Sequence, residues 1–297
     1  MAAQGRFHVT STELAVRARG VVKSYGEVHA LRGIDLDVHR GECVSLLGPN
    51  GAGKTTATEI LEGYRSRDAG EVSVLGVDPA VGGLEWKARL GIVLQTASDL
   101  KELRVAEAVA HFAKYYPDPA DADAVITAVG LEEKRTARVR ELSGGQRRRL
   151  DVALGIIGRP DVLFLDEPTT GFDPEARRQF WTLIEDLKAK GVTILLTTHY
   201  LDEAERLADR VAIIASGRVV ADRTPSALRA EATRNTTVAW LEDGSTMQVR
   251  TDRPTQTVRD LLARFDGEIP ELSVTRPSLE DVYLHLTGNH GEAEASA

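Results

Sequence analysis

Cysteine, excess basic charge and long apolar runs are all scarce or absent in this chain of 297 residues. Cys43 is the only cysteine, which excludes an intramolecular disulfide and a thiolate zinc cluster. The 37 Lys and Arg residues are outnumbered by 45 Asp and Glu residues, so no global basic field favours nucleic acid. No stretch approaches the ~20 consecutive apolar residues of a membrane helix, and we expect another chain to provide any membrane passage.

Residues 1–11 lack the apolar core of a secretory signal peptide, and the chain has no internal repeat, heptad array or low-complexity tract. The composition is that of an ordinary soluble globular protein, with 42% hydrophobic and 28% charged residues. Cys43 stands in the apolar run Cys43–Leu47, where we expect it to act as a buried small hydrophobe. Such a thiol is consistent with a reducing cytoplasm.

The hydrophobic pattern predicts an α/β domain with an antiparallel portion. Short apolar runs alternate with helical patterns from about Leu14 to Glu231, which is typical of an α/β fold. Alternation at Ile34, Leu36 and Val38 predicts a strand with one solvated face. Three continuous runs predict strands buried on both faces: Cys43–Leu47, Val162–Leu165 and Thr193–Thr197.

The β pattern disappears between Gln95 and Leu142, where helical periodicity predicts an insertion at about residues 96–145. This insertion belongs to a first domain, which we expect to span residues 1–231. Beyond it, a hairpin around Asp243-Gly244 and two further helical faces predict a small α+β extension over residues 232–288. We expect the polar residues 289–297 to be a disordered tail.

A glycine-rich segment fits the phosphate-loop pattern, directly after one predicted strand and at the start of a predicted helix. Its glycines let backbone N–H groups converge on phosphates, and the helix N-terminus adds positive potential. We expect Lys54 to reach the β- and γ-phosphates of ATP and the Thr55 hydroxyl to bind Mg²⁺. The predicted ATP-contacting residues here are Gly48, Pro49, Asn50, Gly51, Ala52, Gly53, Lys54, Thr55 and Thr56.

Two carboxylates end the apolar strand predicted at Val162–Leu165. After a phosphate loop, Asp166 is placed to hold Mg²⁺ through water, and Glu167 to orient or deprotonate the attacking water. The sequence therefore predicts ATP hydrolysis.

A second glycine-rich helix start follows Leu142. Its Ser143, Gly144, Gly145 and Gln146 could form another anion-binding nest at a helix N-terminus. Phosphate-loop kinases and GTPases do not need such a second nest, so this segment separates the chain from them.

Together these motifs resemble the nucleotide-binding domain of ABC transporters over about Leu14–Ala230, because the pentapeptide from Leu142 to Gln146 matches the family signature in full. The resemblance implies a phosphate-loop NTPase core, with ATP and Mg²⁺ as cofactors. Phe172 stands where leucine is common in the family and keeps the apolar character. The presence of Glu167 argues against a cassette that no longer hydrolyses ATP.

The resemblance also implies roles for four single residues. Tyr25 stands where the family places the aromatic ring that stacks on adenine, a contact worth ~1–3 kcal/mol. Gln95 matches the glutamine that contacts Mg²⁺ and water and links to the membrane partner. Asp173 matches the aspartate loop that acts across the dimer, and His199 matches the switch histidine at the γ-phosphate.

In this family each ATP lies between the phosphate loop of one cassette and the signature of the other. One loop and one signature in the chain therefore imply a homodimer with ATP between the subunits. The other partner implied is a separate integral-membrane permease, with no nucleic acid. The predicted location is the cytoplasmic face of the cell membrane, as a peripheral subunit.

Three segments resemble the drug-resistance branch of the family and are similar to the ATPases of anthracycline-type exporters: Leu61–Arg65, Val74–Gly76 and Pro277–Gly288. This resemblance implies ATP-driven export of a hydrophobic compound such as a drug or lipid.

Two alternatives stay open: a soluble ABC ATPase of translation or DNA repair, and an importer ATPase. Translation factors of this type carry two cassettes and repair ATPases a long coiled coil, and the sequence shows neither. The run Arg147–Arg149 could suggest nucleic acid, but in an acidic chain we expect a solvated helix face.

Overall fold

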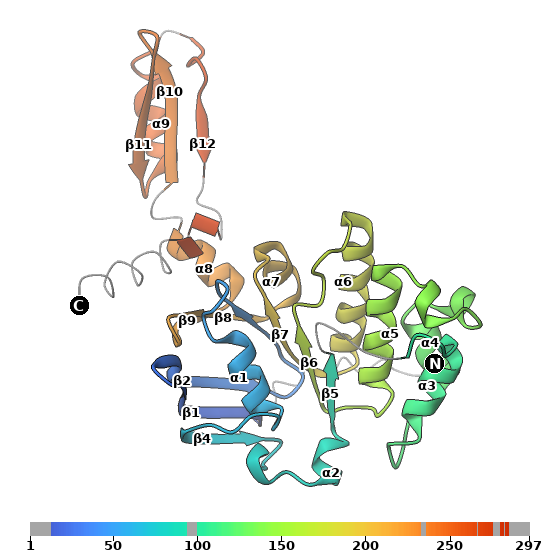
Figure 1. Cartoon of the computed structure of the whole chain (residues 1–297). Coiled ribbons are helices and arrows are strands. Elements are labelled where there is room, and N and C mark those ends of the chain that lie inside the picture. The colour runs from blue at the N-terminus through green and yellow to red at the C-terminus, as the bar shows by residue number, and fades with distance from the viewer. Residues whose placement is uncertain are drawn as a thin grey trace, which may run out of the picture. The chain divides into compact units, whose positions relative to one another are not determined.

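The computed structural model describes residues 13–93, 100–232, 236–265, 267–275, 280–281 and 283–284 (Figure 1). The chain divides into two compact units, Met1–Val220 and Ala221–Ala297. This division falls within a strand, Arg218–Arg223, and precedes the domain boundary after residue 231 that the nucleotide motifs predict. That later boundary stays a prediction about where an independently folding nucleotide-binding domain ends.

The first unit is built on two sheets. One has the strand order β5–β6–β7–β3–β8–β9, and β5, β6, β7, β3 and β8 run parallel. The other is antiparallel, with the order β2–β1–β4. The strands are β1 (Leu14–Tyr25), β2 (Val28–His39), β3 (Cys43–Leu47), β4 (Ala69–Val74), β5 (Leu90–Val93), β6 (Val162–Asp166), β7 (Thr193–Thr198), β8 (Arg210–Ala215) and β9 (Arg218–Arg223).

Helices connect the parallel strands, as the alternating pattern predicts. They are α1 (Lys54–Leu61), α2 (Leu84–Lys87), α3 (Val105–Ala113), α4 (Ala122–Ala128), α5 (Gly144–Ile156), α6 (Pro174–Ala189) and α7 (Leu201–Leu207). A further helix, α8 (Pro225–Ala232), follows β9 and belongs to the second unit. Over residues 100–143 the structure has α3, α4 and two 3₁₀ turns and no strand, in the segment where the helical insertion is predicted.

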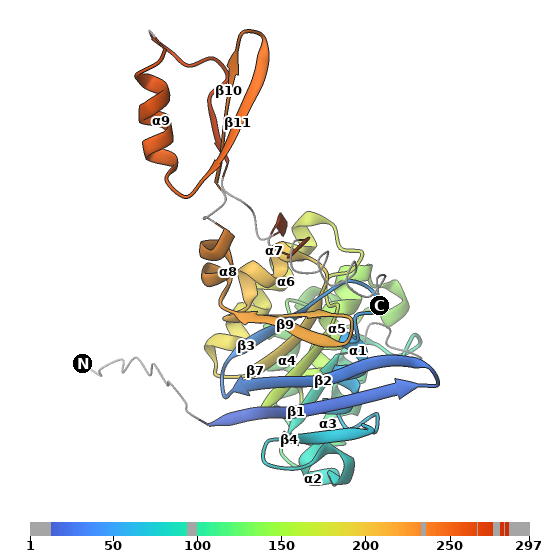
Figure 2. The same ribbon diagram turned by 90° about the vertical axis from the view of Figure 1, so that its left-hand side faces the viewer.

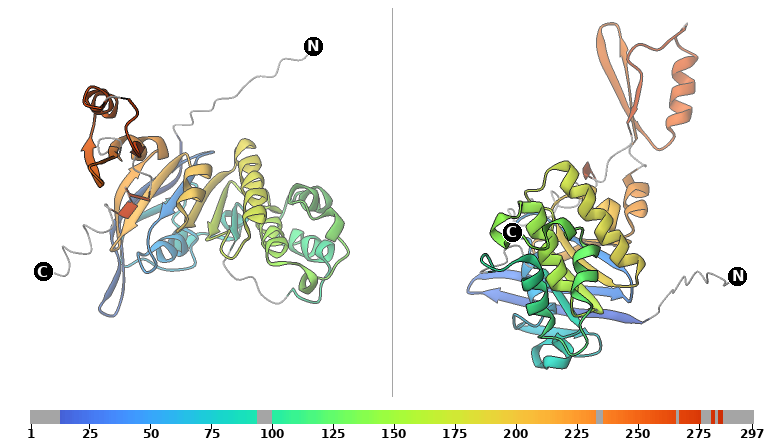
Figure 3. Two further views of the ribbon diagram at one scale, coloured as in Figure 1. Left: turned by 90° about the horizontal axis from the view of Figure 1, so that it is seen from above. Right: turned by 90° about the vertical axis from the view of Figure 1, so that its right-hand side faces the viewer.

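The parallel sheet is covered on both faces, and alternate side chains of its strands enter two different hydrophobic cores. Along β6, Val162 and Phe164 pack with α1 and the antiparallel sheet, whereas Leu163 and Leu165 pack with helices α3 to α6. Figure 2 shows the antiparallel sheet as a layer of its own, and in Figure 3 the helices α3–α6 gather on the other side of the parallel sheet. The predicted α/β fold class, with its antiparallel portion, is confirmed.

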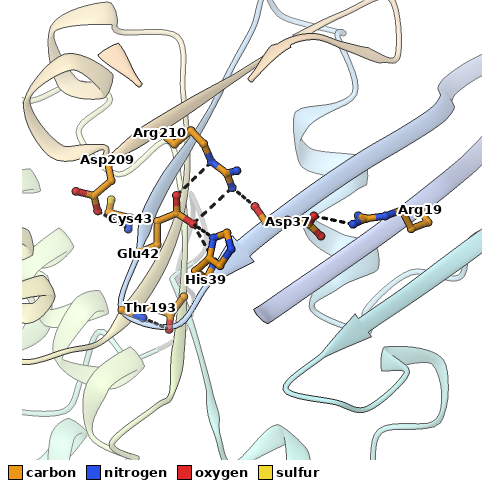
Figure 4. Close-up of polar contacts among 9 residues, drawn as sticks. Arg19, Asp37, His39, Glu42, Cys43, Thr193, Asp209 and Arg210 are labelled. Carbon is orange, nitrogen blue, oxygen red and sulfur yellow. Dashed lines mark hydrogen bonds and ion pairs between the residues drawn. The ribbon is translucent and has the colours of Figure 1, made fainter. Parts of the chain in front are cut away.

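Ionic contacts join the two sheets at the start of β3 and β8 (Figure 4). The Nε atom of Arg210 lies 3.2 Å from Oε1 of Glu42, and its Nη2 atom donates to the carbonyl oxygen of Asp37 in β2. The carboxylate of Asp37 in turn lies 2.6 Å from Nη2 of Arg19 in β1. These contacts fix the antiparallel layer to the amino ends of the parallel strands, at the opposite edge from the predicted phosphate loop.

The second unit contains a small antiparallel sheet with the order β11–β10–β12 and the helix α9. Its elements are β10 (Thr236–Glu242), β11 (Ser245–Thr251), α9 (Pro254–Leu262) and β12 (Ser273–Thr275). The core consists of Val238, Trp240, Leu261 and Ile269. The predicted hairpin is present, while the tail at 289–297 and most of the last predicted helical face lie outside the described residues.

Glu62, at the C-terminal end of α1, is a buried acid that the hydrophobic pattern does not single out. Its exposed fraction is 6%. Burial, together with the nearby carboxylates of Asp166 and Glu59, raises the pKa of its carboxyl group from 4.5 to about 7, and burial has the largest effect. A carboxyl group whose pKa is raised in the folded state makes that state less stable once it is ionised.

We therefore predict that Glu62→Gln stabilises the nucleotide-free protein at high pH only. The folded wild type binds this proton more tightly than the unfolded chain, so its unfolding free energy falls as the pH rises from 4.5 to about 7. The amide cannot ionise, and at pH 8 the variant should be more stable by roughly 1–3 kcal/mol. Urea unfolding at pH 4.5 and pH 8 measures this, with the exposed Glu71→Gln as control. A difference between Glu62→Gln and wild type that is equal at both pH values would contradict it.

Candidate active site

The loop between β3 and α1 follows a path that only glycine permits at two positions. A Cβ atom on Gly48 would lie 2.4 Å from the carbonyl oxygen of Ile214, and one on Gly53 would lie 2.5 Å from that of Ala30. Gly53 also has a φ of 104°, in the left-handed region. The backbone of the loop is therefore pressed against its neighbours, and its outer side stays open to a ligand.

The start of α1 supplies unpaired backbone donors. The helical ladder begins where the amide of Ala57 donates to the Gly53 carbonyl at 2.9 Å, so the amides of Lys54, Thr55 and Thr56 have no acceptor within the helix. Together with the helix dipole they favour an anion in front of the loop. These are the donors that the phosphate-loop pattern predicts.

Lys54 is almost fully buried, with an exposed fraction of 6%. Its Nζ atom donates to the carbonyl oxygens of Gly48 at 2.8 Å and Pro49 at 3.2 Å. Burial lowers the pKa of this ammonium, and the neighbouring carboxylates of Glu167 and Asp166 oppose that effect. The Lys54 ammonium group is therefore already positioned to bind a ligand that carries more negative charge than these carboxylates.

A cavity of about 390 Å³ opens in front of this loop. Thr55 and Asp166 line it together, so a hydroxyl and a carboxylate oxygen face the same space. Such oxygen donors suit Mg²⁺, which binds few protein ligands and keeps water and phosphate oxygens for the rest. The lining residues are Ala30, Asn50, Gly51, Gly53, Lys54, Thr55, Thr56, Asp166 and Glu167.

Thr197, in the strand next to β6, holds the carboxylate of Asp166 and the backbone of Glu167. Its hydroxyl donates to Oδ1 of Asp166 at 2.5 Å and accepts from the amide of Glu167 at 3.1 Å. The amide of Glu167 also donates to the Thr197 carbonyl at 3.1 Å. One side chain thus fixes the end of β6 and the direction in which the chain leaves it.

Glu167 lies between the two groups that the sequence places at the γ-phosphate. Its Oε1 atom is 3.9 Å from Nζ of Lys54 and 3.3 Å from Nδ1 of His199. Its φ of 43° is in the left-handed region, which is uncommon for a residue with a side chain. Lys54 and His199 are far apart in the chain, and both lie at the carboxylate of Glu167. A group that activates water beside a phosphate requires such a position.

The signature segment lies elsewhere in the chain and does not line this cavity. Ser143 caps α5, since its hydroxyl accepts from the amide of Gln146 at 3.3 Å while the Gln146 side chain accepts from the amide of Ser143 at 3.1 Å. Ser143 and Gly144 are exposed, and Gly145 is half-buried. Within one chain the two predicted anion sites are separate.

The other predicted site residues surround the site without joining this cluster. Tyr25 is 41% exposed, and the cations of Lys23 and Arg65 lie 5.6 Å and 5.2 Å from the centre of its ring. Asp173 caps α6, because its Oδ1 atom accepts from the amides of Glu175 and Ala176 at 2.9 Å and 2.8 Å. Gln95 lies outside the described residues.

Arg148 is the main residue of this region that the sequence reasoning missed. The prediction that the run Arg147–Arg149 forms a solvated helix face is wrong for Arg148, because its exposed fraction is 6%. From α5 it donates through Nε to the carbonyl oxygen of Pro168 at 3.0 Å and through Nη2 to that of Asp166 at 2.6 Å. The signal was available: Arg148 stands four residues before the buried Val152, on the same face of the helix.

No helix within the described part of the chain is both long enough and apolar enough to cross a membrane.

Comparison with known proteins places residues 31–170 in the family model described as ABC transporter. The chain is 35% identical to a daunorubicin resistance ATP-binding protein of Streptomyces coeruleorubidus, with 96% of this chain and 99% of the relative covered. It is 38% identical to a Nod factor export ATP-binding protein of Burkholderia orbicola, over 91% of this chain and 96% of the relative.

Solved structures give the same result for the fold. An ATP-binding cassette of an ABC transporter in its ADP conformation has a TM-score of 0.65 and 25% identity, over 72% of this chain and 92% of that one. The ATP-binding subunit of another ABC transporter has a TM-score of 0.65 and 27% identity, over 73% of this chain and 92% of that one.

Because Arg148 connects α5 to the backbone that carries Asp166, we predict that Arg148→Met lowers ATP turnover more than ATP affinity. Two carbonyl oxygens lose their donor, and a small displacement of a catalytic group can cost about 10²-fold in rate. Turnover and nucleotide binding are measured on the same preparation, with the half-buried Arg147→Met as matched control. Equal losses in both variants would show that Arg148 has no special connection to the site.

Proposed function

The chain belongs to the ABC transporter family of ATP-binding proteins, and on that premise we propose that it is the ATP-hydrolysing subunit of an exporter whose membrane-spanning part is a separate permease. The observation that carries the proposal is the position of Glu167, between Lys54 and His199 and beside the phosphate-loop cavity. The names of the similar proteins, which concern daunorubicin resistance and Nod factor export, support the direction of transport.

ATP binds with its phosphates on the amides of Gly51, Gly53 and the first turn of α1, and Lys54 contacts the β- and γ-phosphates. Thr55 and Asp166, with Gln95, hold Mg²⁺, Asp166 acting through water. When bound, this ion neutralises charge that develops on the phosphate oxygens. Tyr25 stacks on the adenine, and the cations of Lys23 and Arg65 lie near its ring.

Glu167 orients the attacking water and accepts its proton, while His199 contacts the γ-phosphate. Thr197 and Arg148 hold the end of β6, so that this carboxylate is placed before the nucleotide arrives. The positive φ of Glu167 supports this role, since strained backbone is retained where the surrounding structure fixes it.

Two copies of the chain form a homodimer with ATP between them. The signature residues from Ser143 to Gln146, with Asp173, complete the site of the opposite subunit. The separation of signature and cavity within one chain supports this arrangement. ATP then links the subunits, and its hydrolysis releases them. The dimer works at the cytoplasmic face of the membrane, and the exported compound is a hydrophobic drug or lipid.

The first test concerns the signature. Ser143→Arg should leave ATP binding to the isolated monomer nearly intact and should block turnover, because Ser143 serves the nucleotide of the opposite subunit. Binding and turnover are measured side by side. If ATP binding falls as much as turnover does, the signature does not act across subunits.

The second test concerns Glu167. Glu167→Gln keeps the size of the side chain and removes the base, so turnover should fall by roughly 10²–10⁴ while ATP and Mg²⁺ still bind. Because intact ATP holds the subunits together, the variant should elute as a dimer with ATP and as a monomer with ADP in size-exclusion chromatography. Unchanged turnover would refute the role of the carboxylate. An inactive variant that stays monomeric with ATP would refute the ATP-linked dimer instead.

A further inference from the structure

Among the residues that the structure describes, the sheet of the second unit has one long edge without the features that usually protect such an edge. β11 is exposed from Ser245 to Arg250, contains no proline and carries Arg250 as its only charge. The opposite edge, β12, has three residues within the described part of the chain, which is interrupted after Thr275. Natural sheets shorten or charge their edges because unpaired strands associate with other chains. β11 is thus a long edge left available for pairing.

The turn before β11 determines which backbone groups point outward. Asp243 and Gly244 have φ values of 52° and 76°, which makes this a two-residue type I′ hairpin. The flanking residues Glu242 and Ser245 then form a hydrogen-bonded pair, and such pairs alternate along the ladder. The N–H and C=O groups of Thr246, Gln248 and Arg250 therefore point away from β10.

A row of apolar side chains also stops at this edge. Met247 pairs with Trp240, and Val249 pairs with Val238, on the face of the sheet that α9 covers. Val238 and Trp240 are 0% and 7% exposed, whereas Met247 and Val249 are 44% and 37% exposed. Another strand beside β11 would extend this row and cover both side chains.

We infer that the partner of this edge is β11 of a second copy of the chain, paired antiparallel about a twofold axis at Gln248. The register in which all seven residues overlap places Thr246 opposite the partner's Arg250 and Met247 opposite the partner's Val249. Outward-pointing backbone groups then face outward-pointing groups, apolar residues face apolar ones, and no two like charges are opposed. The two small sheets become one six-stranded sheet.

The self-complementarity of the strand favours a second copy over another extended segment. A twofold pairing requires one strand to match itself in hydrogen-bond direction, apolar row and charge, and β11 does so in its fully overlapping register. A single pair of seven-residue strands associates weakly alone. The inference rests on the proposed function in one respect: the ATP-linked dimer brings the two second units to a high effective concentration.

Cysteine cross-linking of the full-length chain tests the register. In a Glu167→Gln background with ATP and Mg²⁺, Gln248→Cys places two thiols across the axis, with Cα atoms about 5.5 Å apart, within the range of a disulfide. The control Thr246→Cys places its two thiols roughly 13 Å apart. Cys43 can stay, because it is 0% exposed and burial raises the pKa of its thiol to about 12.

Under mild oxidation, non-reducing electrophoresis should show at least about fivefold more dimer for Gln248→Cys than for Thr246→Cys, since only the former meets the disulfide geometry. Equal yields would overturn the inference. An ATP-dependent dimer in size-exclusion chromatography without the specific cross-link would also overturn it, and would leave the proposed function standing. The specific cross-link without an ATP-dependent dimer would support the pairing and refute the ATP-linked dimer.

A charge variant tests the same axis without oxidation. Gln248→Lys opposes two like charges across it and should weaken the ATP-dependent dimer several-fold. In the control Ser245→Lys, the new lysine lies opposite the partner's Thr251. No like charges then face each other, and the dimer should be unchanged. If Gln248→Lys leaves the dimer unchanged but abolishes copurification with the permease, the edge binds a permease strand and the inference is wrong.

Discussion

Strands β3, β7 and β6 are neighbours in the parallel sheet, so the segments that leave their carboxyl ends meet at one edge of it. The phosphate loop follows β3, the two carboxylates end β6, and His199 follows β7. These three segments lie together because their strands are neighbours in the sheet, however far apart they are in the sequence. The hydroxyl of Thr197 then connects two of these strand ends, and the whole cluster depends on β6 and β7 keeping their register.

In the proposed dimer this edge forms one half of a nucleotide site, and the signature, at a different place in the chain, forms the other half for the opposite subunit. Helix α5 begins at the signature, and its Arg148 holds the backbone at Asp166 and Pro168. A displacement of helix α5 would therefore shift the backbone at the end of β6. In the proposed dimer, each subunit would sense through α5 whether the nucleotide of the opposite subunit is in place, without any direct contact between the two nucleotides.

Much of this could be predicted from the sequence, because its strongest signals are local. The glycines of the phosphate loop, the apolar run before Asp166 and the glycine-rich helix start after Leu142 each concern a few adjacent residues, and the structure places them as elements in the expected order. The alternation at Ile34, Leu36 and Val38 likewise predicted a strand with one covered face.

The rest depends on contacts between distant segments. The role of Thr197 requires knowing that β7 lies beside β6, which no local pattern states. Arg148 was missed because a run of three arginines is ordinarily a solvated face, and its burial follows from the helices packed around α5. The raised pKa of Glu62 likewise arises from burial and from Asp166, a residue distant in the chain.

The left-handed backbone at Glu167 has a consequence for how this protein would respond to selection. Holding a residue with a side chain at a φ of 43° stores strain of about 1–3 kcal/mol, which glycine would relieve and asparagine would reduce. Selection for heat resistance alone would therefore favour replacing the carboxylate that the proposed chemistry uses as its base. Thermal stability and activity make opposite demands at this position, and a thermostable homologue that keeps the glutamate must obtain its stability elsewhere.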